Sequence, residues 1–178
     1  MRDLSVRSAT VEDAPAIAQV HWDSWAVTYS GVFPQQSFDE YPLAGRAQMW
    51  AREAGLNADA TRRSQLLVAV QDDAVAGFAH VGPYRVQVDD APAAAADGEL
   101  RALYLDPARQ RQGVGRVLWT ASVAHLRSLG FTAMRLWCLA GNTAESFYRA
   151  MGARQVGSAA FDAHGVALRE HCYRIEPL

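Results

Sequence analysis

The sequence contains no lysine, and all 17 of its basic residues are arginine. Without lysine the chain can form neither a Schiff base with a carbonyl substrate nor the lysine–phosphate contact of a P-loop. Any anionic ligand must therefore be bound by arginine side chains or by backbone N–H groups.

Cysteine and long apolar runs are also scarce. Cys138 and Cys172 lie far apart and outside any CxxC or Cys/His spacing, so we expect no metal site. They are typical of buried thiols in a reducing compartment. No apolar run approaches the roughly 20 residues that span a bilayer, and the first residues carry no signal-peptide stretch. We therefore expect a cytoplasmic protein without a membrane partner.

A surplus of positive charge is missing too. The formal net charge is −2, which argues against binding to a nucleic-acid backbone. The 178 residues are half hydrophobic and one-fifth charged, as in ordinary globular proteins. Without an internal repeat or a linker, residues 1–178 are expected to form a single domain.

The apolar periodicity predicts helices alternating with strands. The expected order is one strand, two helices, three strands, a helix, a strand, a helix and two strands, which is typical of a mixed α/β fold with a partly antiparallel sheet. We expect strands at residues 4–7, 65–70, 74–81, 99–105, 132–139, 154–157 and 166–175, and helices after Thr10, at 44–54, from the glycine turn to 129 and from 142 to 152.

The segment from Gln110 to Gly115, Gln-Arg-Gln-Gly-Val-Gly, follows a strand and opens a long helix. The first turn of a helix has N–H groups without intrahelical partners, and its dipole makes that end positive. Glycines let a ligand approach the backbone, so the segment predicts an anion-binding turn that needs no lysine. Arg111 and Arg116 could add positive charge.

Other interpretations of these glycines compete with that one. The segment could be a simple turn. A P-loop is excluded because no Gly-Lys-Ser/Thr occurs, and a dinucleotide-binding fingerprint would need a glycine or alanine where Leu118 stands.

Two segments together resemble the GNAT superfamily of acyl-CoA-dependent N-acyltransferases. The first is Gln110-x-x-Gly113-x-Gly115 after a strand that ends near a proline; the second contains Asn142, Ala144, Phe147, Tyr148 and Gly152. The sequence departs from the family pattern at Arg109, Arg111 and Ala153. The resemblance implies a GNAT-like mixed, mostly antiparallel central sheet flanked by about four helices.

The resemblance also implies acetyl-CoA as the acyl donor and allows for a homodimer. The strand at 103–105 would lend backbone groups to the pantetheine arm and an amide to the thioester oxygen, an oxyanion-hole contribution. Asn142 would bind the pantetheine arm, cap its helix, or do both. The expected cofactor-binding residues are Leu103, Tyr104, Leu105, Gln110, Arg111, Gln112, Gly113, Val114, Gly115, Arg116 and Asn142.

Acetyl transfer to an amine needs a proton acceptor for the amine and a proton donor for the leaving thiolate. By resemblance, Glu99 is the candidate base and Tyr148 the candidate acid. Glu99 could instead be a solvated strand-end carboxylate, with Glu170 as a weaker alternative base. Tyr148 could serve only in core packing.

Aromatic residues cluster on and after the first helix. In GNAT-like proteins this region covers the acceptor pocket, so Trp22, Trp25 and Tyr29 are candidate substrate-binding residues. Core packing is the competing interpretation, and a catalytic His21 is less favoured still.

The predicted function is transfer of an acetyl group from acetyl-CoA to a primary amine of a small molecule or peptide. The alternative is a non-catalytic acyl-CoA-binding regulatory module, which would need neither Glu99 nor Tyr148. A dinucleotide-binding domain would bind NAD and not CoA.

Overall fold

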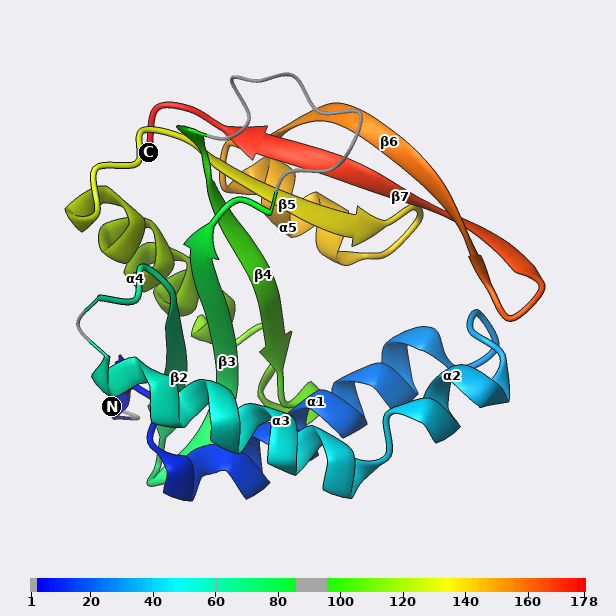
Figure 1. Ribbon diagram of the computed structural model, residues 1–178, viewed down its shortest axis with the longest axis horizontal. Coiled ribbons are helices and arrows are strands. Elements are labelled where there is room, and N and C mark those ends of the chain that lie inside the picture. Colours follow the sequence, from blue (N-terminus) through cyan, green and yellow to red (C-terminus); the bar gives the residue numbers. More distant parts are fainter. Residues whose placement is uncertain (1–2, 60, 86–95) are drawn as a thin grey trace.

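The computed structural model describes residues 3–59, 61–85 and 96–178. In these ranges seven strands form one sheet in the order β1-β2-β3-β4-β5-β7-β6, and only the β4–β5 pair is parallel. With helices on both faces (Figure 1), the predicted mixed, mostly antiparallel α/β fold is confirmed. The strands are β1 (Leu4–Ser8), β2 (Gln65–Gln71), β3 (Ala74–Pro83), β4 (Gly98–Leu105), β5 (Met134–Leu139), β6 (Arg154–Ala163) and β7 (Val166–Ile175).

Helices α1 (Ala14–Tyr29) and α3 (Leu43–Gly55) cover one face of β2–β4, and the short α2 (Gln35–Glu40) connects them. The chain enters α1 through a turn in which the Asp13 carboxylate accepts the N–H of Thr10 at 2.8 Å, a capping contact at the helix start that the sequence places after Thr10. Ile17, Trp50 and Phe78 fill the core between these helices and the sheet.

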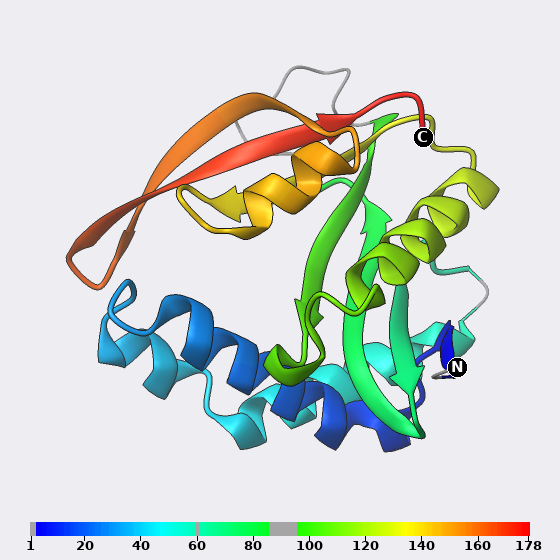
Figure 2. The ribbon, with the colours of Figure 1, turned by 180° about the vertical axis from the view of Figure 1, so that it is seen from behind.

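Helices α4 (Val114–Ser128) and α5 (Ala144–Ala150) lie on the opposite side, as the reversed view shows (Figure 2). Leu118 and Leu126 of α4 and Met134 of β5 are almost wholly buried and belong to the larger core. The two cores hold the sheet from both faces, which fixes the positions of β4 and β5 between them.

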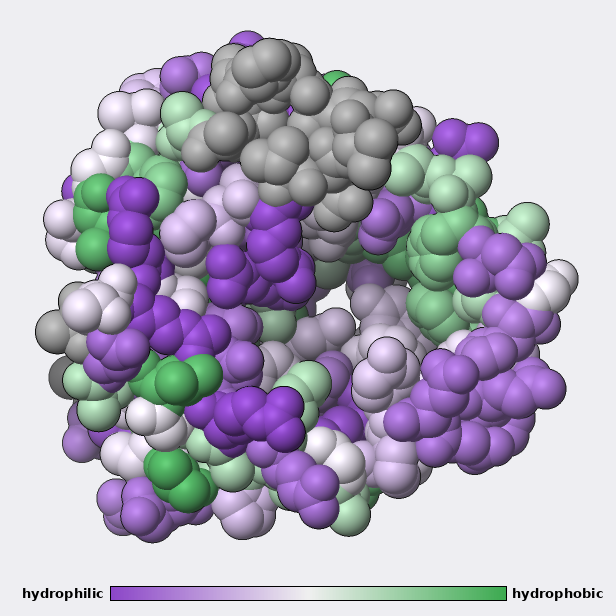
Figure 3. Space-filling view, in the orientation of Figure 1, coloured by the Kyte–Doolittle hydropathy of each residue, from purple (hydrophilic) through white to green (hydrophobic). Residues whose placement is uncertain are grey.

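Strands β4 and β5 are paired only at one end. Gly98 pairs with Met134 and Glu99 with Arg135, and beyond these residues the two strands diverge (Figures 1 and 2). Asp97 clamps the paired end, since its carboxylate accepts Arg135 Nε at 2.7 Å and Arg174 Nε at 2.8 Å. The β4 edge that faces β5 therefore has no strand partner past Glu99, and the space-filling view shows a hollow between this half of the sheet and α1–α3 (Figure 3).

A bulge decides which way the side chains of β4 face. His80 pairs with Ala102 but Val81 pairs with Leu100, so Arg101 is an extra residue on β4. In a regular strand Glu99 and Tyr104 would face opposite sides. The bulge puts both on the side of α1, opposite Gly82 and Phe78 of β3.

The structure differs from the sequence prediction in two elements, α2 and β6. The predicted break after the first helix contains the six-residue α2, between Pro34 and Pro42. Strand β6 runs on to Ala163, past the predicted end at residue 157, and the described residues contain five α-helices where about four were expected. Within the described ranges, no helix has the length and apolar character needed to span a membrane.

Candidate active site

The glycine turn has the geometry of an anion site. Gly113 caps α4 with φ +91°, and Arg111 also lies in the left-handed region at φ +62°. In the described part of the chain, the N–H groups of Gly113, Val114 and Gly115 have no backbone acceptor. These N–H groups are therefore available to an anion, and the phosphate site that the sequence analysis expects here stays a prediction.

The three arginines near this turn behave differently. Arg109 Nη1 donates to the backbone oxygen of Gln71 at 2.7 Å, which ties this residue to the end of β2. Arg111 and Arg116 are exposed, and neither forms an ion pair with another described residue. The two exposed arginines, and not Arg109, are thus available to an anionic ligand.

Asn142 lies at the opposite wall of the gap between β4 and β5. Its Oδ1 accepts the N–H of Ala144 at 2.9 Å, and its Nδ2 donates to the Tyr29 hydroxyl at 3.3 Å. Asn142 thus both stabilises the start of α5 and reaches a residue of α1. The backbone of Leu103, Tyr104 and Leu105 lies across the gap, on the unpaired edge of β4.

Four weak acids converge between β4, β5, α1 and α5. The hydroxyl of Tyr148 interacts electrostatically with those of Tyr29 and Tyr104 and with the thiol of Cys138. Tyr104 also accepts the indole N–H of Trp25 at 3.2 Å. The sequence did not single out Cys138 as a site residue, because its neighbours come from distant segments.

Burial keeps these groups protonated. It raises the pKa of Tyr148, of which only 8% is exposed, well above its ordinary value, and Cys138, Tyr104 and Tyr29 add to the rise. It raises the pKa of the Cys138 thiol to about 12. A thiolate released in this environment would be strongly basic, and a protonated phenol lies beside it.

Glu99 is buried at the point where β4 and β5 separate. Its side chain is 4% exposed, and both oxygens accept hydrogen bonds from Arg85, at 2.7 Å from Nη2 and 3.0 Å from Nε. Arg101 Nε lies 3.6 Å from the carboxylate. The Arg85 side chain itself is 64% exposed, so the buried Glu99 carboxylate is paired with a residue that reaches the surface.

Glu170, the weaker alternative, lies on β7 opposite Leu139 of β5. Its half-buried carboxylate has no hydrogen bond or ion pair to another described residue, and burial raises its pKa. Tyr148 lies in the large core, as the packing interpretation requires, and also among the four weak acids, so its acid role stays a prediction beside its packing role.

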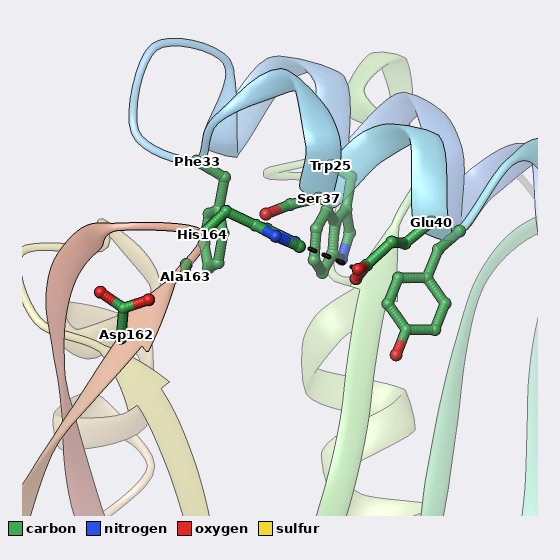
Figure 4. Close-up of a pocket in the computed structure, with 8 residues that line it drawn as sticks. Trp25, Phe33, Ser37, Glu40, Asp162, Ala163 and His164 are labelled. Carbon is green, nitrogen blue, oxygen red and sulfur yellow. Dashed lines mark ion pairs between the residues drawn. The ribbon is translucent and has the colours of Figure 1, made fainter.

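A pocket of about 460 Å³ lies between the α1–α2 region and the β6–β7 turn (Figure 4). Glu40 and His164 reach across it, with Oε1 and Nε2 3.3 Å apart, whereas Asp162 accepts the N–H of Gly165 at 2.8 Å and stabilises the turn. The pocket is lined by Trp25, Phe33, Ser37, Glu40, Tyr41, Asp162, Ala163 and His164.

The candidate aromatic residues divide around this pocket. Trp25 lines it, and Tyr29 packs against Trp25 with ring centroids 5.0 Å apart. Trp22 is not part of the lining and packs against Phe38. His21 is buried and accepts the indole N–H of Trp50 at 3.1 Å, so it belongs to the core.

Across the described residues, no three His, Cys, Asp or Glu side chains gather as a metal site would require. The residues that do gather are donors and weak acids, arranged around a long gap that ends at a helix N-terminus. This arrangement suits an extended ligand with an anionic group at one end and a reactive group near Tyr148.

Comparison with known proteins agrees with this geometry. The model of the acetyltransferase (GNAT) family matches residues 16–153. YuaI of Bacillus subtilis (strain 168), an uncharacterised N-acetyltransferase, is 33% identical over 169 residues, which cover 94% of this chain and 90% of YuaI.

Two solved structures share the fold. The PaiA N-acetyltransferase from Thermoplasma acidophilum, in complex with coenzyme A, has a TM-score of 0.73 at 18% identity and covers 98% of this chain and 99% of its own. YncA from Salmonella typhimurium, with its cofactor acetyl-CoA, has a TM-score of 0.70 at 18% identity and covers 97% of this chain and 93% of its own.

Proposed function

The chain belongs to the GNAT family of acetyltransferases, and we propose that it transfers the acetyl group of acetyl-CoA to a primary amine by direct attack in a ternary complex. One observation carries this proposal: the divergence of β4 from β5 leaves a gap bordered by the unpaired edge of β4, by Asn142 and by Tyr148. The pantetheine arm would lie along this edge, and the pyrophosphate would bind the N–H groups at Gly113–Gly115 and the side chains of Arg111 and Arg116.

In the proposed reaction the neutral amine attacks the thioester carbon, a C–N bond forms and the C–S bond breaks. A backbone N–H of the 103–105 segment would stabilise the oxyanion. Tyr148 would give its proton to the departing sulfur. Holding both substrates in one gap supplies the proximity contribution.

For the amine proton we propose Glu99 as the acceptor. The bulge at Arg101 turns Glu99 to the α1 side, the side of Tyr104 and Trp25. Because both carboxylate oxygens already accept hydrogen bonds from Arg85, the proton would arrive through a water molecule.

Turnover is tested by incubating the protein with acetyl-CoA and a panel of small amines, amino acids and peptides while free thiol is measured. Amine-dependent thiol release supports the enzyme. Tight acetyl-CoA binding with no release for any amine would instead favour the regulatory acyl-CoA-binding module.

The catalytic assignment is tested by Tyr148→Phe, which should lower kcat about 100-fold because the proton donor is lost. The affinity for acetyl-CoA, measured by calorimetric titration, should stay within about threefold. An unchanged kcat would show that Tyr148 serves only in core packing.

Glu99→Gln and Glu170→Gln form a matched pair for the base. We expect Glu99→Gln to lower kcat about 100-fold and Glu170→Gln to change it by less than about threefold. A large loss of kcat in Glu170→Gln and a small one in Glu99→Gln would identify Glu170 as the base.

A further inference from the structure

Arg46 of α3 is buried to an unusual degree for an arginine. It is 1% exposed and is the largest of the fully buried side chains in the described residues. Its Nε donates to the backbone oxygen of Tyr41 at 2.8 Å, and its Cζ lies 4.7 Å from the ring centroid of Trp25 and 5.6 Å from that of Trp22. The guanidinium is thus held between two indole rings.

The charge of Arg46 has no counter-ion within the described part of the chain. No carboxylate there forms an ion pair with it, and its buried Nη2 has no hydrogen-bond partner. Guanidinium groups stay protonated in proteins, and a buried charge without a partner costs folding free energy. Stacking on the two indoles offsets part of that cost. The cost that is not offset indicates that Arg46 has a role beyond packing.

The neighbours of Arg46 connect it to the 460 Å³ pocket, which the candidate substrate-binding residue Trp25 lines. Trp25 and Tyr41 both contact Arg46 and both line the 460 Å³ pocket. Trp25 also donates its indole N–H to the Tyr104 hydroxyl, which belongs to the group around Tyr148. One side chain, that of Trp25, therefore connects Arg46 both to the pocket and to the Tyr104 hydroxyl.

His21 shows how this environment changes the pKa of a basic group. Burial, and then the charge of Arg46, lower the pKa of His21 to about 3. An amine that binds on the other side of Trp25 carries the same kind of charge. Its protonated form would be disfavoured for the same two reasons.

We propose that Arg46 is a positioning residue for the acceptor: it holds Trp25 against Tyr104 and supplies a buried positive charge that favours the neutral, nucleophilic form of the acceptor amine. This inference rests on the proposed function. The positive charge of Arg46 would weaken the binding of the amine proton before that proton passes to Glu99.

The other charged groups near this site leave the Arg46 charge in place. In the described residues, His21 of α1 and Tyr104 of β4 interact with it, and both are neutral near pH 7. Glu99 of β4 pairs with Arg85, and Glu170 of β7 has no ion pair to another described residue. Glu40 of α2 and Asp162 of β6 line the pocket, and Glu40 Oε1 lies 3.3 Å from His164 Nε2. These two pocket carboxylates would attract the incoming ammonium.

The test is the pH profile of kcat, which reports ionisations in the enzyme–substrate complex. For the wild type, with the best amine from the panel, the acidic limb should lie at least about one pH unit below the solution pKa of that amine. Arg46→Met should move the limb upward by about one pH unit and lower kcat about tenfold below the limb. Arg46→Lys should keep the limb in place because it keeps the charge.

Trp25→Phe is the matched control, since it keeps a ring over the guanidinium and removes only the N–H donated to Tyr104. It should lower kcat without moving the limb. A wild-type limb at the solution pKa of the amine would overturn the inference even if Arg46→Met failed to fold. So would a folded Arg46→Met whose profile overlays the wild type, or a Trp25→Phe limb that moves as far. No turnover by the wild type with any amine would overturn the proposed function as well.

Discussion

His21 and His80 are buried where a positive charge is strongly disfavoured. Trp50 can only donate, so the Nδ1 atom of His21 is an acceptor and the ring is neutral. Burial, with a contribution from Arg46, lowers the pKa of His21 to about 3. Burial, with contributions from nearby arginines, lowers the pKa of His80 to about 3 as well.

These two residues predict acid lability. Above pH 6.5 both histidines are neutral in the folded and unfolded states, so their contribution to stability is complete. As the pH falls from 6.5 toward 3, the unfolded chain binds protons that the folded chain excludes. Each histidine then removes about 1.4 kcal/mol of unfolding free energy per pH unit. Urea unfolding at pH 7, 6 and 5 measures this slope.

His21→Asn and His80→Gln should each flatten the slope, because each removes one group that protonates only on unfolding. Asn offers Trp50 a carbonyl oxygen in place of Nδ1, so it is the milder change at position 21. Slopes equal to that of the wild type in both variants would contradict the assignment of the acid lability to these histidines.

The sequence identified some of the key single residues and gave no signal for others. Motif position and helical spacing pointed to Tyr148, and clustering on the first helix pointed to Trp25. Arg46 and Cys138 gave no local signal. Arg46 is placed by contacts with an indole on α1 and with the backbone oxygen of Tyr41. Cys138 lies near phenols on three other elements.

Among the elements, the start of α4 carries the cofactor prediction. Gly113 at φ +91° caps the helix at its N-terminus, and Gly130 at φ +84° follows its C-terminus. A Cβ atom at either position would meet no atom within 4 Å, so alanine would bring backbone strain and no clash. The two glycines are therefore a matched pair.

Gly113→Ala and Gly130→Ala should each lower the unfolding free energy by about 1 kcal/mol, because alanine disfavours the left-handed region. Only Gly113→Ala should weaken acetyl-CoA binding, by about tenfold or more, because it alters the N–H groups proposed to hold the pyrophosphate. Calorimetric titration measures the affinity, and thermal unfolding measures the stability. Equal affinities in the two variants would place the pyrophosphate elsewhere.

Elements with strong local signals were predicted well, and short or small-residue elements were not. Asp72 and Asp73, at φ +50° and +61°, form a tight hairpin turn between β2 and β3, in the short gap between the strands predicted at 65–70 and 74–81. Helix α2 has six residues between two prolines, too few for a periodic pattern. The part of β6 beyond residue 157 begins Ser-Ala-Ala, which shows neither the β-branched residues nor the alternation of a half-buried strand.

For the whole molecule, the decisive feature is the parallel pair that opens after Glu99. The seven strands of the described residues form one sheet, and the single domain expected over residues 1–178 stays a prediction. The divergence of β4 and β5 had no local signal apart from the family resemblance, because strand pairing across the α4 connection depends on contacts far apart in sequence. The bulge at Arg101, which turns Glu99 toward α1, was likewise invisible in the spacing of residues 99–105.

Thermal unfolding with acetyl-CoA, free CoA, NAD or ATP, each added alone, is the most direct test of the proposed acetyl-CoA site. At a hundred times its dissociation constant, a ligand of the folded state adds about 2.7 kcal/mol, which for a chain of this size raises Tm by about 5–10 °C. We predict such a shift with acetyl-CoA and with CoA and none with NAD. A shift with NAD alone, or no shift with either CoA species at millimolar concentration, would contradict the assignment of the β4–β5 gap and the Gly113 turn to acetyl-CoA.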